Sequence, residues 1–263
     1  MATEYLTNDI ELTSVADAIR AKSGQTGQLI YPDGFASAVA GIKKAPTTPY
    51  MVAEYEQELM TEYESASYIK KAKLYNHTRI AAYEFTQQNL LQELDTSDPS
   101  NNITTIDTSA FAGSMCENVI IPETVTLIGS GAFSNANIGT MILPGSVTRV
   151  SFGAFSDVKG VNDVAPVIKL NEGLAVIETS AFNFAGISGE MEIPSTVTEI
   201  GAYCFNGASI TTFICKPTTP PALWSDAFYT GTAGFTIKVP AASVAAYKAA
   251  DGWKDYASYI VAM

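Results

Sequence analysis

The stretch TLIGSGAF at residues 126–133, followed after a short spacer by MILP at 141–144, is the clearest copy of a phrase that recurs along most of the chain. Its phenylalanine recurs in steps of 22 to 27 residues, and the proline that ends the second segment keeps the same rhythm. Periods of this length are typical of solenoids, in which each unit is too small to bury its own apolar face and stacks on its neighbours. The recurring phenylalanines are Phe85, Phe111, Phe133, Phe155, Phe182, Phe205 and Phe228.

Each unit is expected to contain two short strands joined by a corner. The segment before the proline carries apolar residues two apart, which predicts a strand with those residues in the core and the residue between them outside. The Ala-Phe pair is expected to turn a helical corner with the ring in the interior. After Phe205 either Phe213 with Cys215 or Ile214 alone faces inward. The other predicted core pairs are Val119 with Ile121, Met141 with Leu143, Ile168 with Leu170, Met191 with Ile193, and Ile237 with Val239.

The composition narrows the class of partner. The 263 residues leave room for a sizeable core, and the apolar runs are far shorter than a membrane span, so we expect no membrane partner. The net charge is −12 with only 15 lysines and arginines, whereas phosphate binding needs clustered basic side chains. We therefore expect no nucleic acid partner.

The sequence contains no arrangement typical of a catalytic or metal site. Cys116, Cys204 and Cys215 form no CxxC pair and are odd in number, which predicts buried free thiols and neither a zinc site nor a disulfide framework. The single histidine, His77, has no motif partner and is interpreted as a surface or capping residue. We predict no enzyme, no metal and no cofactor.

Two further patterns were weighed as ligand sites. Residues 129–131 (GSG) lie inside a repeat and lack the lysine of a phosphate loop. Asp95, Asp98 and Asn101 offer oxygen ligands for calcium, but no glutamate follows at the spacing that a calcium loop requires. Both patterns are interpreted as turn chemistry.

The first 45 residues predict a separate helical module. Leu12, Val15 and Ile19 share one helical stripe, and a second short helix places Phe35, Val39 and Ile42 on another. Two helices of this size cannot bury enough surface alone. They either pack against the first repeat or attach the protein elsewhere, including to another copy in a homo-oligomer.

Residues 46–77 are expected to be a linker and an N-terminal cap. Pro46 and Pro49 stiffen the linker. For residues 50–76 the spacing of the apolar residues favours a helix, whereas the alternation of Glu54, Glu56 and Glu58 favours a strand. We expect the helix.

The repeated phrase, IGxxAF followed by xIxIPxxV, resembles the BspA-like (Treponema-type) leucine-rich repeats over residues 78–240. The resemblance implies an α+β right-handed solenoid of about seven units. Residues 241–263 resemble the helical cap of that family, with Val244, Tyr247 and Trp253 covering the last unit. The unit after Phe155 departs from the pattern, because it has five extra residues near 161–165 and lacks the proline.

The segments ELTSVADAIRAK at 11–22 and YPDGFASAV at 31–39 resemble an N-terminal module of virion proteins encoded by phages and prophages of Gram-positive bacteria. This resemblance implies that residues 1–45 bind other virion proteins. The N-terminus has no basic and apolar signal segment, which agrees with assembly in the host cytoplasm.

The leading hypothesis is a non-enzymatic virion protein of a tail, baseplate or head whose repeats bind a protein or glycan on a host cell. The alternative is a cell-surface adhesin, and an enzyme would need a catalytic constellation that only folding could assemble. Binding is expected on the outward residues of the second strands, apolar in the first units and charged in the later ones. These are Asn118, Ile120, Thr140, Ile142, Val167, Lys169, Glu190, Glu192, Thr212 and Lys238.

Overall fold

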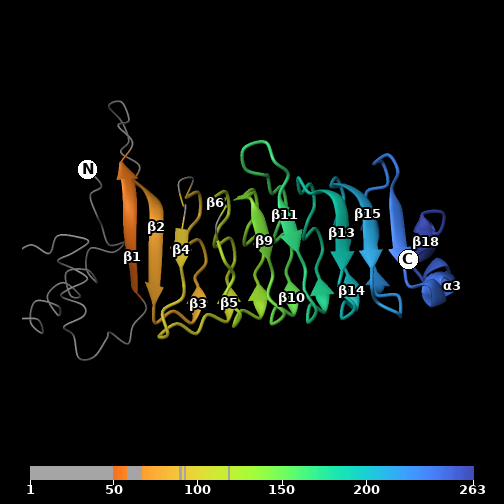
Figure 1. Ribbon diagram of the computed structural model, residues 1–263, viewed down its shortest axis with the longest axis horizontal. Coiled ribbons are helices and arrows are strands. Elements are labelled where there is room, and N and C mark those ends of the chain that lie inside the picture. The colour runs from red at the N-terminus through yellow and green to blue at the C-terminus, as the bar shows by residue number, and fades with distance from the viewer. Residues whose placement is uncertain (1–49, 58–66, 89–90, 92, 118) are drawn as a thin grey trace, which may run out of the picture. The chain divides into compact units, whose positions relative to one another are not determined.

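The computed structural model describes residues 50–57, 67–88, 91, 93–117 and 119–263 (Figure 1). The chain separates into two compact units, one of Met1–His77 with Leu94–Asn101 and one of Thr78–Glu93 with Asn102–Met263. The helices expected within residues 1–45 lie outside the described residues, as do the attachment residues Leu12, Val15, Ile19, Phe35, Val39 and Ile42.

The first unit contains a three-stranded sheet in the order β1-β2-β4. β1 (Tyr50–Gln57) pairs antiparallel with β2 (Ser67–Tyr75), and β4 is Glu93–Asp95. The helix expected for residues 50–76 is therefore wrong. In β2 the buried Ala72 and Leu74 alternate with the lysines at 71 and 73, and this period of two is that of a half-buried strand.

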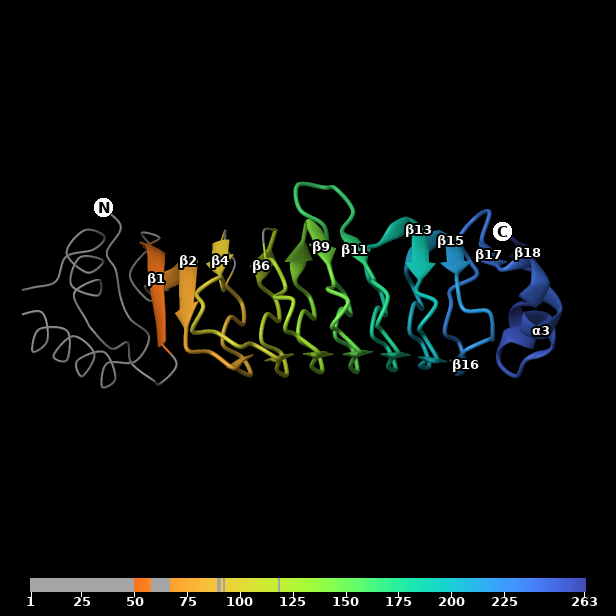
Figure 2. The ribbon, with the colours of Figure 1, turned by 60° about the horizontal axis from the view of Figure 1, so that its bottom comes forward.

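The second unit is a parallel β-solenoid of about eight turns. Its first strands are two residues long and form one seven-stranded parallel sheet, which lines up along one side of the stack in Figure 2. These strands are β3 (Arg79–Ile80), β5 (Thr105–Ile106), β7 (Leu127–Ile128), β10 (Arg149–Val150), β12 (Val176–Ile177), β14 (Glu199–Ile200) and β16 (Ala222–Leu223).

The remaining strands of the repeats form three shorter parallel groups, β6-β8, β9-β11 and β13-β15-β17-β18. Their bounds are β6 (Met115–Cys116), β8 (Asn137–Ile138), β9 (Thr140–Ile142), β11 (Val167–Lys169), β13 (Ser188–Ile193), β15 (Ser209–Cys215), β17 (Thr236–Val239) and β18 (Ile260–Ala262). β6 and β8 precede the segments that carry the predicted core pairs. The fold has little helix, so the expected α+β class and the helical corner are both wrong for the described repeats.

The seven recurring phenylalanines form one column through the solenoid. Successive ring centroids from Phe85 to Phe205 lie 5.0 to 5.2 Å apart with interplanar angles of at most 8°, and the last step, from Phe205 to Phe228, is 5.9 Å. Every ring is buried. Each contributes about 1.5–3 kcal/mol by leaving water, and stacking adds to this.

The turn around each phenylalanine is held by backbone hydrogen bonds to the next repeat. The N–H of Phe111 donates to the carbonyl of Ala132 (2.7 Å), and that of Phe133 donates to the carbonyl of Ala154 (2.8 Å). The residue two before the phenylalanine has a positive φ in all seven turns, which allows the chain to reverse without a helix. These residues are Tyr83, Ser109, Gly131, Gly153, Ser180, Tyr203 and Asp226.

The predicted core pairs of the second strands are confirmed. All ten side chains are buried, and Phe213 and Cys215 face the interior while Ile214 is half-buried. Alternation along a strand therefore places the residues between them outside.

The five extra residues of the fourth unit form a small hairpin that projects above its neighbours in Figure 1 (green, before β11). Val161 and Val164 form an antiparallel bridge across Asn162 and Asp163, whose φ values of 53° and 62° suit a tight turn of this kind. The column is undisturbed, because the rings of Phe155 and Phe182 remain 5.1 Å apart.

The C-terminal residues cover the last repeat with several short elements: η1 (Ala241–Ser243), α3 (Val244–Ala249), η2 (Trp253–Tyr256) and β18. Tyr247 and Trp253 are buried and donate to the carbonyls of Pro217 and Pro221. The single helix expected to carry Val244, Tyr247 and Trp253 does not form. In the part of the chain that the structure describes, no helix has the length and apolar character to span a bilayer.

Replacing Phe133 with alanine tests the role of the column. The variant leaves a cavity between two rings, and we expect the free energy of unfolding to fall by about 3–5 kcal/mol in denaturant titration. The matched control is Phe152→Ala, which removes an exposed ring and should change stability by less than about 0.5 kcal/mol. Equal losses in both variants would contradict the structural role of the column.

Candidate functional site

The outward residues of the segments that precede the prolines form the strand face. Residues 119–121, which include Ile120, continue this row of segments without forming a strand. Ile120, Ile142 and Val167 are 77%, 52% and 43% exposed, which is unusual for aliphatic side chains so close together. In the register of β9 and β11, Thr140 lies opposite Val167 and Ile142 opposite Lys169. Thr140 and Lys169 are also exposed, as predicted for residues that alternate with the core, and their role in binding stays a prediction. Asn118 lies outside the described residues.

A groove of about 520 Å³ lies on this face. Ile120, Thr140 and Val167 line it together with Val164, which comes from the projecting hairpin and is 68% exposed. We call Ile120, Ile142, Val164 and Val167 the apolar patch. Sequence reasoning missed Val164, although the insertion that carries it was visible as a break in the repeat period.

The later strands of the face are charged, and their charges are paired. Glu192 contacts Lys216 (2.7 Å) and Glu190 contacts Lys238 (3.8 Å). Glu190 and Glu192 are exposed, whereas Thr212 and Lys238 are half-buried. Exposed pairs of this kind add little to stability, but they leave this half of the face close to neutral. The strand face thus has an apolar half and a charged half in which glutamates and lysines pair with each other.

The oxygen cluster considered for calcium serves its own loop. Asp95 pairs with Lys73 (2.8 Å) and accepts from Ser97, and these contacts hold the pKa of Asp95 at about 2. Asp98 accepts from Ser100, and Asn101 donates to backbone carbonyls. Among the described residues no three His, Cys, Asp or Glu side chains gather in a geometry that could hold a metal ion.

His77 is buried, not on the surface as one interpretation had it. Its Nδ1 lies 2.9 Å from the carbonyl oxygen of Tyr75, and its backbone N–H donates to Asn101. These contacts account for the residue as part of the packing of the first unit.

All three cysteines are buried free thiols, as predicted. Burial raises the pKa of the thiols of Cys116, Cys204 and Cys215, so the reactive thiolate is suppressed. They act as small core residues.

We expect a disulfide reagent such as DTNB to label no thiol of the native protein at pH 8 and all three in denaturant. The physical reason is that both the burial and the raised thiol pKa must be lost before attack. Rapid labelling of one thiol in the native state, measured by absorbance and by mass, would contradict the packing around that cysteine.

A search of curated proteins finds none that matches the chain. The profile of the BspA type leucine rich repeat region, in contrast, matches residues 78–211 and 165–244 in six copies. These ranges span the phenylalanine column, the strand face and the start of the C-terminal elements. The chain therefore belongs to the BspA-type leucine-rich repeat family.

Proposed function

We propose that this protein is a non-enzymatic recognition protein that binds a protein partner through the apolar patch of the strand face. The observation that carries the proposal is the exposure of three aliphatic side chains that line one groove, Ile120, Val164 and Val167, together with the exposed Ile142, which lies two residues after Thr140 in β9. Membership in the BspA-type family, which suggests a protein-binding or adhesin-like repeat protein, supports it.

The energetics favour an apolar contact. Full burial of an exposed isoleucine or valine against a partner contributes about 1.5–3 kcal/mol to the binding free energy. The patch can therefore act as the centre of an interface. The charged half, where Glu190 and Glu192 are already paired with lysines, fits the polar rim of such an interface.

For the biological setting we propose a phage virion, in which residues 1–45 bind other virion proteins and the repeats face the host cell. This part rests on the resemblance of segments 11–22 and 31–39 to virion modules. The alternative, favoured by the family itself, is an adhesin at a bacterial cell surface that binds a host protein or glycan.

Substitution of the patch tests the binding surface. We expect Ile120→Glu combined with Ile142→Glu to weaken binding of the labelled full-length protein to intact bacterial cells by about tenfold or more, because about 1.4 kcal/mol of contact energy is enough for that loss. Trp224→Glu, which replaces an exposed apolar side chain outside the strand face, is the control and should bind as the parent does. Protease treatment of the cells should abolish binding. Undiminished binding by the double variant, or to protease-treated cells, would refute the proposal.

The setting is tested on particles. We expect an antibody to detect the protein in phage particles purified on a density gradient, and Leu12→Glu with Ile19→Glu to remove it from them. The charge change disrupts an apolar stripe, whereas Lys22→Gln on the same segment serves as control. Light scattering of the same full-length variants shows whether the stripe also forms a homo-oligomer. Recovery of the parent protein with the cell envelope and not with particles would favour the adhesin.

A further inference from the structure

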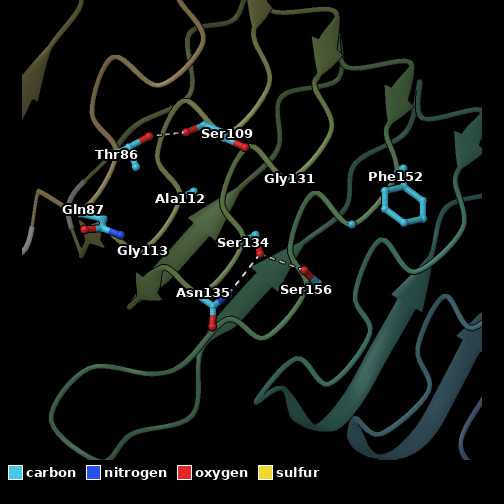
Figure 3. A pocket seen from close by; sticks show the side chains of 11 residues that line it. Thr86, Gln87, Ser109, Ala112, Gly113, Gly131, Ser134, Asn135, Phe152 and Ser156 are labelled. Atoms are coloured by element: carbon cyan, nitrogen blue, oxygen red, sulfur yellow. Dashed lines mark hydrogen bonds between the residues drawn. The ribbon is translucent and has the colours of Figure 1, made fainter.

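A second groove lies on the turns around the phenylalanine column (Figure 3). Its volume is about 400 Å³, within the range of about 300–1,000 Å³ found for ligand pockets. It crosses the turns of four successive repeats, those of Phe85, Phe111, Phe133 and Phe155. We call it the turn groove.

The polar side chains of the turn groove are neutral. Four hydroxyl groups line it, from Thr86, Ser109, Ser134 and Ser156, and two amides, from Gln87 and Asn135. The hydroxyls of Ser134 and Ser156 lie 3.0 Å apart, and the amide nitrogen of Asn135 donates to Ser134 (3.3 Å), as Figure 3 shows. Within the described residues, the side-chain amide oxygen of Asn135 and the side-chain amide of Gln87 make no hydrogen bond.

An aromatic ring stands at one end of the turn groove. Phe152 is 57% exposed, and the part of the ring that stays in water does not stabilise the fold. Equivalent positions in other turns also carry exposed aromatic residues. Tyr83 and Tyr203 stand at the position of Gly131, two residues before the phenylalanine of the column. Phe184 stands at the position of Asn135, two residues after it.

Glycine keeps the middle of the turn groove open. Gly131 has a φ of 60°, but the equivalent turns carry Tyr83 (64°) and Tyr203 (54°), so a side chain is compatible with this backbone. A Cβ atom built on Gly131 would meet only Ser109 Oγ at 3.4 Å and Ser134 Cβ at 3.9 Å, which are ordinary contacts. A side chain can therefore be accommodated here, at the backbone cost that a positive φ imposes on any residue other than glycine. What the glycine provides is space in the groove.

We propose that the turn groove binds a neutral saccharide. Hydroxyl and amide groups can both donate and accept, which matches the hydroxyl groups of a sugar, and an exposed ring offers its face to the C–H groups of a pyranose. No lysine, arginine, histidine, aspartate or glutamate is among the lining residues, which argues against a phosphate, sulfate or sialic acid ligand. A protein partner would be expected on a surface with more apolar anchors, such as the strand face.

This inference goes beyond the proposed function, because it names a second ligand class on a different surface. The strand face and the turn groove share no lining residue. A test can therefore refute binding at the turn groove and leave the proposed function of the strand face intact, or the reverse.

A glycan array that contains neutral hexose and N-acetylhexosamine oligosaccharides beside sialylated and sulfated ones tests the proposal with the full-length protein. We expect neutral glycans to bind. The strongest is then titrated calorimetrically, and Gly131→Tyr, which puts a large side chain at the middle of the groove, should weaken binding by about tenfold or more. Gly131→Ser is the matched control, since it imposes a similar backbone cost with a small side chain and should stay within about twofold.

Two further variants sharpen the result. Phe152→Ala should weaken binding, whereas Trp224→Ala, an equally exposed ring three repeats away, should not. The Ile120→Glu and Ile142→Glu variant of the strand face should bind the glycan as the parent does. No binding of any neutral glycan at about 1 mM, binding of anionic glycans alone, or equal binding by the Gly131→Tyr variant would each overturn the proposal.

Discussion

The stack of seven phenyl rings is the interaction on which the repeat unit depends. Rings about 5 Å apart set the distance between repeats, and this distance matches the spacing at which backbones of neighbouring strands hydrogen-bond. One aromatic residue per turn thus serves both the core and the register of the parallel strands. The insertion before β11 shows how strong the constraint is, because five extra residues are pushed outward while the rings stay in contact.

Because the distance between repeats is constant, residues at the same position of successive repeats lie in a row on the surface. Positions that alternate with the core along the second strands become the strand face, and positions beside the phenylalanine become the turn groove. Because the column supplies the stability, these outer rows are free to vary. Thr140 and Val167 share one row of the strand face and Ile142 and Lys169 another, whereas glycine, serine and tyrosine share a row of the turns. The two proposed binding surfaces are consequences of this division between inner and outer positions.

Much of the repeat region could be predicted because its signals are local and repeated. The phenylalanine period, the buried pairs such as Met141 with Leu143, and the outward Ile120 and Ile142 all follow from spacing, and the structure confirms them. Residues 50–76 could not be assigned in the same way. The spacing of their apolar residues predicted a helix, whereas the alternation of glutamates predicted a strand. In the structure, pairing between β1 and β2 favours the strands.

The sequence by itself determined that the chain stacks its repeats on inward phenylalanines and that its three cysteines are buried free thiols. These conclusions rest on periodicity and on residue chemistry, which survive without coordinates. Only the tertiary structure decided that the corner is a turn with positive φ and not a helix, that Val164 joins the apolar patch, and that Gly131 leaves a groove beside Phe152. These three features depend on backbone angles or on contacts between different repeats. The spacing of residues within one repeat predicts neither the angles nor the contacts.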